Sequence, residues 1–165
     1  MTTTDRFALP LLAAGQAQKE VTHNEALAVL DLLVQPIVQS VAPTAVPLTP
    51  AAGQCWIVGS GASGAWLGHD GALAGWTGGG WRFVAPREGM ACWSVADDVV
   101  VRWVAGAWVI GNVTAKVLRV NGIQVVGPQQ PAVAPPSSGA NVDVEARSAL
   151  AALIGALQRH GLIAT

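Results

Sequence analysis

The stretch Cys55–Ile110, CWIVGSGASGAWLGHDGALAGWTGGGWRFVAPREGMACWSVADDVVVRWVAGAWVI, decides the fold. Short apolar runs alternate in it with glycine-rich steps, which is typical of an antiparallel β meander or barrel. It holds all seven tryptophans of the chain: Trp56, Trp66, Trp76, Trp81, Trp93, Trp103 and Trp108. A tryptophan side chain buries roughly 150–250 Å², so seven of them suffice for a small core. The sequence therefore predicts a tryptophan-rich antiparallel β domain over residues 42–110.

Residues 1–41 are predicted to form an arm and a helix that dock to neighbouring molecules. Thr22-His23-Asn24-Glu25 has the pattern of a capping box, so we expect the helix to begin there. One apolar stripe follows at helical spacing: Ala26, Leu27, Leu30, Leu33 and Val34. Pro36 should end the helix at Val34 or Gln35. The β-branched run 37–41 then predicts a short strand.

The tail after residue 110 predicts three further parts. Residues 111–127 contain Asn121-Gly122 between two β runs, which is a strong signal for a β-hairpin. Residues 128–141 form a proline-rich linker, and residues 142–165 a C-terminal helix that mediates oligomerisation or docking. Asn141 or Asp143 can cap that helix, and Gly161 can end it. Its apolar stripe is Ala146, Leu150, Leu153, Ile154 and Leu157.

These elements predict a mainly β chain: an N-terminal helix, a small tryptophan-rich antiparallel β meander or barrel, a β-hairpin and a C-terminal helix. Charged residues make up only 12% of the 165 residues, about half the usual share, and the net charge is −1. A surface with so few charges is typical of a subunit that buries much of its exterior in an assembly. It provides no basic footprint for nucleic acid, and no apolar run is long enough to cross a membrane. The N-terminus lacks the pattern of a secretory signal, so we expect synthesis in the cytoplasm.

The motifs that suggest catalysis or cofactors are weak. Gly59–Gly64 fits the glycine pattern of dinucleotide sites, but the glycines that follow rule out the required helix, and a hairpin loop is expected instead. His69-Asp70 lies in a turn, where neighbouring side chains usually diverge. Asp97-Asp98 is expected to be a solvated turn. We therefore expect no catalytic residue, no cofactor site and no enzyme activity.

Cys55 and Cys92 are the only cysteines in the sequence. Together with His69 they lack the close ligand spacing of a zinc site, so no metal site is predicted. Two cysteines are also too few for a disulfide framework. They are expected to be buried free thiols on strands.

Exposed tryptophans could stack on sugar rings, which gives a second hypothesis of a glycan-binding module. Trp66 and Trp76 flank the glycine-rich loop and are the candidate glycan-binding residues. The alternative is that the tryptophans are packing residues of the core. A third hypothesis, a polysaccharide-degrading enzyme, needs two carboxylates across a cleft. The available acids, Asp70, Glu88, Asp97 and Asp98, make it the weakest of the three.

A polar segment over residues 15–25 has more glutamines and charges than helix capping explains. It is either a solvated loop or a surface that hydrogen-bonds a neighbouring subunit. The candidate docking residues in and near it are Gln16, Gln18, Lys19, His23 and Asn24. In the tail, the candidates are Leu150, Leu153, Ile154 and Leu157.

Leu9-Pro10-Leu11, followed by GQAQKEVTHNEAL over residues 15–27, resembles the opening of an uncharacterised domain family of alphaproteobacterial prophages and gene transfer agents. Later segments are similar to the same family: residues 64–66, residues 79–83 with 85–89, and residues 106–108. The tail segments at residues 120–127 and 156–164 resemble C-terminal parts of fibre proteins from such particles.

This resemblance implies a structural and adhesion subunit of a phage-like particle, a head spike or tail fibre that helps attach the particle to the host surface. The implied partners are other copies of the chain, as a trimer or pentamer, and other particle proteins; host surface polysaccharide is a further candidate partner. The family brings no catalytic motif with it. The expected location is the virion.

Overall fold

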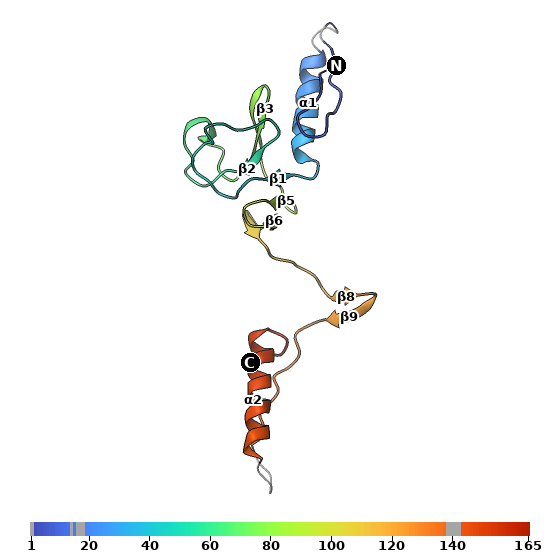
Figure 1. Ribbon diagram of the computed structural model, residues 1–165, viewed down its shortest axis with the longest axis vertical. Helices are drawn as coiled ribbons and strands as arrows, with labels where there is room; N and C mark the ends of the chain where they lie inside the picture. The colour runs from blue at the N-terminus through green and yellow to red at the C-terminus, as the bar shows by residue number, and fades with distance from the viewer. Residues whose placement is uncertain (1, 14, 16–18, 138–142) are drawn as a thin grey trace. The chain divides into compact units, whose positions relative to one another are not determined.

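The computed structural model describes residues 2–13, 15, 19–137 and 143–165 (Figure 1). The chain divides into two compact units, residues 1–112 and residues 113–165. Strands dominate, with a helix near each end and a tryptophan cluster between them, which confirms the predicted fold class. The elements of the first unit are α1 (Lys19–Leu33), β1 (Ile37–Val38), β2 (Cys55–Ile57), η1 (Gly64–Trp66), β3 (Leu73–Thr77), β4 (Gly80–Val84), β5 (Ala91–Ser94), β6 (Val99–Val104) and β7 (Ala107–Ile110). Those of the second are β8 (Leu118–Val120), β9 (Ile123–Val126) and α2 (Val144–Arg159).

The strands of the first unit form two small sheets rather than one meander. One sheet has the order β2-β3-β4 and is antiparallel throughout. The other has the order β1-β5-β6-β7, and β1 runs parallel to β5, with Ile37 opposite Trp93. Parallel neighbours need a long connection, and here the chain from β1 to β5 contains the whole first sheet. The local pattern predicts the antiparallel hairpins, but it cannot show this pairing between distant segments.

Helix α1 begins at Lys19, three residues before the predicted cap, and the prediction that Thr22 caps it is wrong. Glu20 lies in the first turn, where an acidic side chain complements the helix dipole. The Asn24 side chain instead holds the preceding arm: its Oδ1 accepts from the Leu12 N–H, and its Nδ2 donates to the Leu12 carbonyl. The helix ends at Leu33, close to the end predicted from Pro36.

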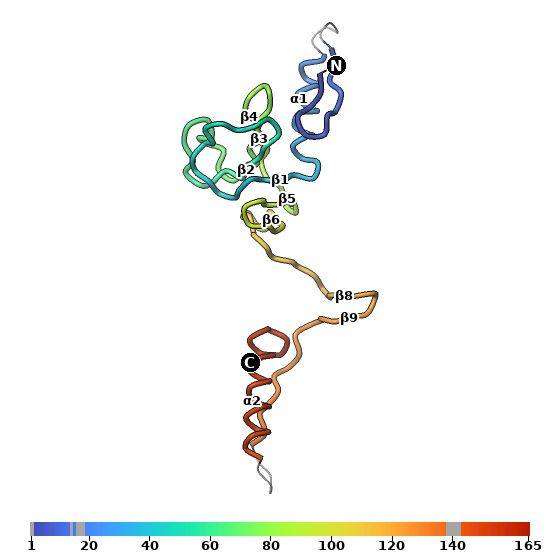
Figure 2. Tube along the Cα trace, viewed as in Figure 1, coloured from blue at the N-terminus to red at the C-terminus, as the bar shows by residue number. Residues whose placement is uncertain are grey.

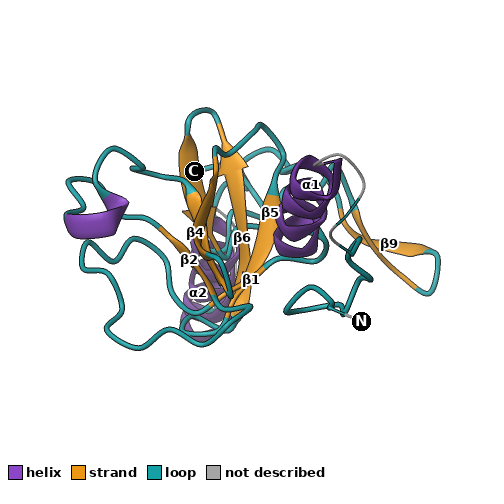
Figure 3. Ribbon diagram, turned by 90° about the horizontal axis from the view of Figure 1, so that it is seen from above, coloured by secondary structure: helices purple, strands orange, loops and turns teal. Residues whose placement is uncertain are grey.

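The sequence predicts a separate arm and helix over residues 1–41. In the structure, these residues belong to the compact first unit. Leu32 of α1 is 1% exposed and lies over Gly75 of β3, where a Cβ would come within 2.5 Å of the leucine methyl carbons. Figure 3 shows α1 beside the strands. One buried cluster joins α1, β1 and both sheets: Leu32, Val38, Cys55, Ile57, Leu73, Cys92 and Val101. The buried residues of α1 are Asp31 and Leu32, whereas Ala26, Leu30 and Val34 of the predicted stripe are exposed, so the predicted stripe is not the face that packs on the strands.

The buried Asp31 carboxylate ties the N-terminal arm to α1. It accepts hydrogen bonds from the Thr4 hydroxyl and from the backbone N–H groups of Arg6 and Phe7, each at 2.8 Å. The Arg6 guanidinium in turn donates to the carbonyls of Asp31, Val34 and Gln35 at the end of the helix. A cation at this end satisfies orphan carbonyls and complements the helix dipole. The arm is thus fixed by polar contacts.

Gly59 is a position at which even one methyl group does not fit. A Cβ there would lie 2.3 Å from the Ala42 carbonyl oxygen, and backbone cannot move aside as a flexible side chain can. We expect Gly59→Ala to lower the free energy of unfolding by about 2–3 kcal/mol, as overpacking does. Gly78→Ala is the control, because nothing lies within 4 Å of its Cβ position. Urea titration followed by circular dichroism measures both, and equal midpoints would contradict the clash.

The tail hairpin is confirmed: β8 and β9 pair antiparallel around Asn121-Gly122, both with positive φ (Figure 2). Helix α2 is capped by Asp143, whose carboxylate accepts from the Ala146 N–H at 2.8 Å. Asn141, the other predicted cap, lies outside the described residues. Gly161 has φ +68° and ends α2 in a Schellman arrangement, with Leu162 N–H donating to the Leu157 carbonyl. No helix in the described ranges is long and apolar enough to span a membrane.

Candidate functional site

Trp66 is fully buried, so the prediction that it lines a glycan groove is wrong. It packs edge-on against Trp81 at 5.3 Å between ring centroids and lies 6.2 Å from Trp56. Trp76 is half-buried and packs edge-on against the same Trp81 at 5.1 Å. Stacking on a sugar requires a free ring face. The Trp66 ring has none, because these indoles form a core of their own.

The tryptophan most exposed to solvent is Trp93, at 40%. It lies on β5 between buried Cys92 and buried Ser94, so the alternation of a strand turns it outward. Its neighbours in register, Ile37 on β1 and Val100 on β6, are also exposed. This face is apolar and shallow, and it offers few polar groups to orient a ligand.

The other sequence motifs serve local structure. The Asp70 carboxylate accepts from the Gly61 N–H at 2.9 Å and thereby closes the glycine-rich loop. His69 stacks on Phe83 with 3.6 Å between ring centroids, so the His-Asp pair diverges, as expected. Asp97 accepts from the Ser94 hydroxyl at 2.6 Å. In the part of the chain that the structure describes, no three His, Cys, Asp or Glu side chains come together as a metal site.

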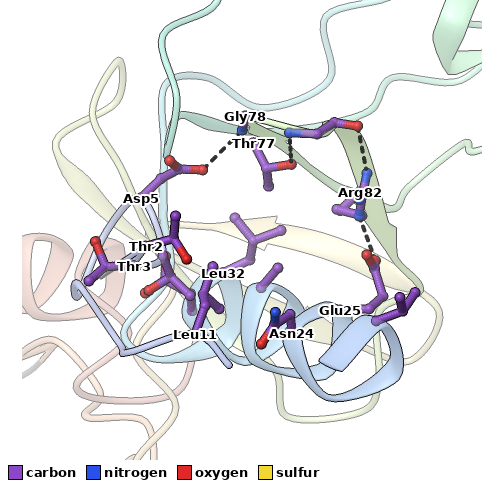
Figure 4. Close-up of a pocket in the computed structure, with 15 residues that line it drawn as sticks. Thr2, Thr3, Asp5, Leu11, Asn24, Glu25, Leu32, Thr77, Gly78 and Arg82 are labelled. Carbon is purple, nitrogen blue, oxygen red and sulfur yellow. Dashed lines mark hydrogen bonds and ion pairs between the residues drawn. The ribbon is translucent and has the colours of Figure 1, made fainter. Parts of the chain in front are cut away.

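A cavity of about 350 Å³ opens between residues 2–5, helix α1 and the turn from β3 to β4; we name it the arm–helix cavity (Figure 4). Its polar lining consists of Thr2, Thr3, Thr4, Asp5, Asn24, Glu25, Asp31, Thr77 and Arg82. Its apolar lining consists of Leu11, Val21, Ala28 and Leu32. An apolar wall with a few convergent polar groups, at a volume of about 300 Å³ or more, is typical of ligand sites.

Hydrogen bonds fix the polar rim of the arm–helix cavity, as Figure 4 shows. Asp5 Oδ2 accepts from the Gly78 N–H at 3.2 Å, which joins the arm to the β3–β4 turn. Glu25 of α1 forms an ion pair with Arg82 of β4 at 2.5 Å. The Thr77 hydroxyl donates to the Gly80 carbonyl at 2.8 Å. The side chains around the rim are therefore held in place from three separate segments.

The predicted docking residues are distributed unevenly. Gln16 and Gln18 lie outside the described residues. Lys19 and His23 are exposed on α1 and remain available to a partner, whereas Asn24 is half-buried and bonded to the arm. In α2, Leu150 and Leu153 are 48% and 55% exposed. Ile154 and Leu157 are half-buried.

The arm–helix cavity was not predicted from the sequence. Thr2, Thr3 and Asp5 belong to a segment without periodicity, and Glu25 fits the capping-box pattern. Arg82 follows a glycine step in a predicted strand. The clustering of hydroxyl and carboxyl side chains in residues 2–5 is the one local signal, and it does not indicate which segments lie opposite.

Cys55 and Cys92 are free and buried, as predicted. Burial raises the pKa of each thiol from 9.0 to about 11. A pKa that is higher in the folded state means that the unfolded chain loses its protons first as pH rises. We expect stability to fall between pH 9 and pH 11, by at most about 2.7 kcal/mol per thiol. Urea unfolding across this range measures the fall in stability. In the double variant Cys55→Ala with Cys92→Ala, the part of the fall that the thiols cause should be absent. An unchanged pH dependence of stability in the double variant would contradict the assignment.

The fold and cavity define a small two-sheet β domain with a helix packed against it, followed by a tail unit. The chain belongs to the family described as a protein of unknown function (DUF2793), whose model matches residues 23–109. This match runs from α1 to β7, and the tail lies beyond it. A comparison with curated proteins gives no match.

Proposed function

We propose that the protein is a structural and adhesion subunit of a phage-like particle, a head spike or tail fibre that helps attach the particle to its host. In this proposal, residues 113–165 join copies of the chain as a trimer or pentamer. The first unit contributes to attachment. The observation that carries the proposal is the exposure of apolar side chains throughout the tail unit.

The tail hairpin buries almost nothing within its own unit. Every residue of β8 and β9 is exposed, including Leu118, Val120 and Ile123 at 53%, 52% and 71%. A two-stranded hairpin alone in water is marginally stable at best. Valines and an isoleucine with open strand edges favour pairing with another chain. A partner that covers both faces of the hairpin would stabilise it.

The apolar residues of helix α2 repeat at the spacing of a coiled-coil helix, which pairs with copies of itself. Ala146, Leu150, Leu153 and Leu157 follow one another at steps of four, three and four residues, which is the a/d seam of a coiled coil. No described residue of α2 is buried. A sixteen-residue helix is marginal without tertiary packing, and most soluble oligomers are symmetric assemblies of one chain. Copies of the chain are therefore the proposed partner.

The assignment to a phage-like particle is supported by the resemblance of residues 9–27 and of the tail segments to proteins of prophages and gene transfer agents. The low charge content of 12% agrees with a subunit largely covered by neighbours. In this proposal the protein is made in the cytoplasm and functions in the virion.

Electron microscopy of particles from the producing bacterium tests the proposal. An antibody against the first unit should label spikes or fibres on particles from the wild-type strain, and particles from a deletion strain should lack both the label and the projections. Purified protein should also compete with particles for adsorption to host cells. Particles that keep every projection and adsorb normally in the deletion strain would overturn the proposal.

A further inference from the structure

We propose that the arm–helix cavity binds a neutral or amino-bearing sugar unit of a surface polysaccharide. This inference deepens the proposed adhesion function, because it names the receptor chemistry and moves the binding site from the tryptophans to the groove beside α1.

The polar lining favours a ligand that is rich in hydroxyl groups. Hydroxyls from residues 2–4 and Thr77, the Asn24 amide and three carboxylates line a space of about 350 Å³. Sugars present several O–H donors on a compact ring, and carboxylates accept strongly from such donors. The apolar wall, which includes Val21, Ala28 and Leu32, can receive the C–H face of the ring.

The charge of the cavity disfavours acidic sugars. Its lining has three carboxylates, Asp5, Glu25 and Asp31, against the single guanidinium of Arg82. Arg82 is paired with Glu25, and Asp31 is occupied by the hydrogen bonds of the arm. A carboxylated or phosphorylated sugar would meet an excess of negative charge, whereas an amino group would be attracted. The expected order of affinity is amino sugar, then neutral sugar, then acidic sugar.

The carboxylates retain capacity to accept further bonds. Within the described residues, Asp5 uses Oδ2 for the Gly78 N–H, and Glu25 uses Oε1 for Arg82. Each carboxylate has a second oxygen, and the two residues lie on separate segments of the rim, as Figure 4 shows. These existing bonds hold the carboxylates in place before a ligand arrives, which reduces the entropic cost of binding.

Saturation-transfer NMR on the full-length protein tests the site with glucosamine, glucose, galactose and glucuronic acid as separate probes. We expect millimolar binding of glucosamine and of at least one neutral hexose, and weaker binding of glucuronic acid. Asp5→Asn and Glu25→Gln should each weaken glucosamine binding about tenfold, since each removes a charged acceptor. Asp98→Asn is the matched control on an exposed turn outside the lining, and it should bind as the wild type does.

A cavity-filling variant guards against indirect effects of the charge changes. Ala28→Leu keeps every polar group and adds volume at the apolar wall, and it should abolish binding while circular dichroism stays unchanged. Light scattering of the same samples reports oligomer mass independently, so loss of sugar binding with normal mass separates this site from the assembly. The inference would be overturned if no sugar bound at millimolar concentration, if binding survived Ala28→Leu, or if glucuronic acid bound most tightly. A change of mass in Ala28→Leu would also overturn it, because the cavity would then belong to a subunit interface.

Discussion

Replacing Leu150 and Leu153 with glutamate should convert the assembled protein to a monomer. Both side chains are about half exposed within their own unit and lie on the α2 seam. Full burial of an exposed leucine contributes about 1.5–3 kcal/mol; since each leucine is already about half buried, the pair would contribute about 1.5–3 kcal/mol per chain to an assembly. Glutamates on every copy would add mutual repulsion at short range. Light scattering should give three or five times the chain mass of 16.9 kDa for the wild type, and 16.9 kDa for the double variant.

The matched control places the same charges on the opposite face of the same helix. Ser148 and Ala152 are exposed and lie about half a turn from the leucine seam. Ser148→Glu with Ala152→Glu should leave the oligomer mass unchanged. If both double variants dissociate, added charge rather than the seam is responsible. If the wild type is itself a monomer at micromolar concentration, the assembly proposal fails.

The parts of the fold that could be predicted are those specified by neighbouring residues. Asn121-Gly122 supplies two positive-φ residues, and only one kind of turn uses them in that order. Asp143 reaches an N–H three residues along its own chain. The glycine steps before Trp81 and Trp108 mark hairpins that the structure contains. In each case the partner that decides the geometry lies within one turn of the chain.

The parts that could not be predicted depend on contacts between distant segments. Trp66 and Trp93 each follow a small or polar neighbour, yet one is fully buried and the other is 40% exposed. Trp66 ends η1 and packs against Trp81, whereas Trp93 lies on the outward face of β5, and no local spacing encodes that difference. Burial of Leu32 requires the missing Cβ of Gly75, forty-three positions later in the chain. The arm–helix cavity needs three segments at once, and its residues therefore carry no common motif.

Trp66→Ala should be the most damaging single change in the first unit. Its side chain is fully buried, and it packs against Trp81 and Trp56. Truncating a buried tryptophan costs about 3–5 kcal/mol, against a total stability of about 5–15 kcal/mol for a domain. The midpoint of urea unfolding, followed by far-ultraviolet circular dichroism, should fall steeply or the unit should not fold. Loss of sugar binding in this variant would therefore report unfolding rather than a lost contact.

Trp66→Phe separates packing from hydrogen bonding at the same position. Within the described residues, the buried indole Nε1 of Trp66 has no hydrogen-bond partner, and such an unsatisfied group costs about 1–3 kcal/mol. Trp66→Phe loses the packing of part of the ring but also removes the unsatisfied N–H. These two effects offset, so the free energy of unfolding should fall by about 1 kcal/mol or less. Trp93→Ala, at a 40% exposed side chain, should cost less than half as much as Trp66→Ala. Equal losses for Trp66→Phe and Trp66→Ala would mean that the N–H is bonded and that hydrogen bonding, rather than ring packing, fixes Trp66 in the cluster.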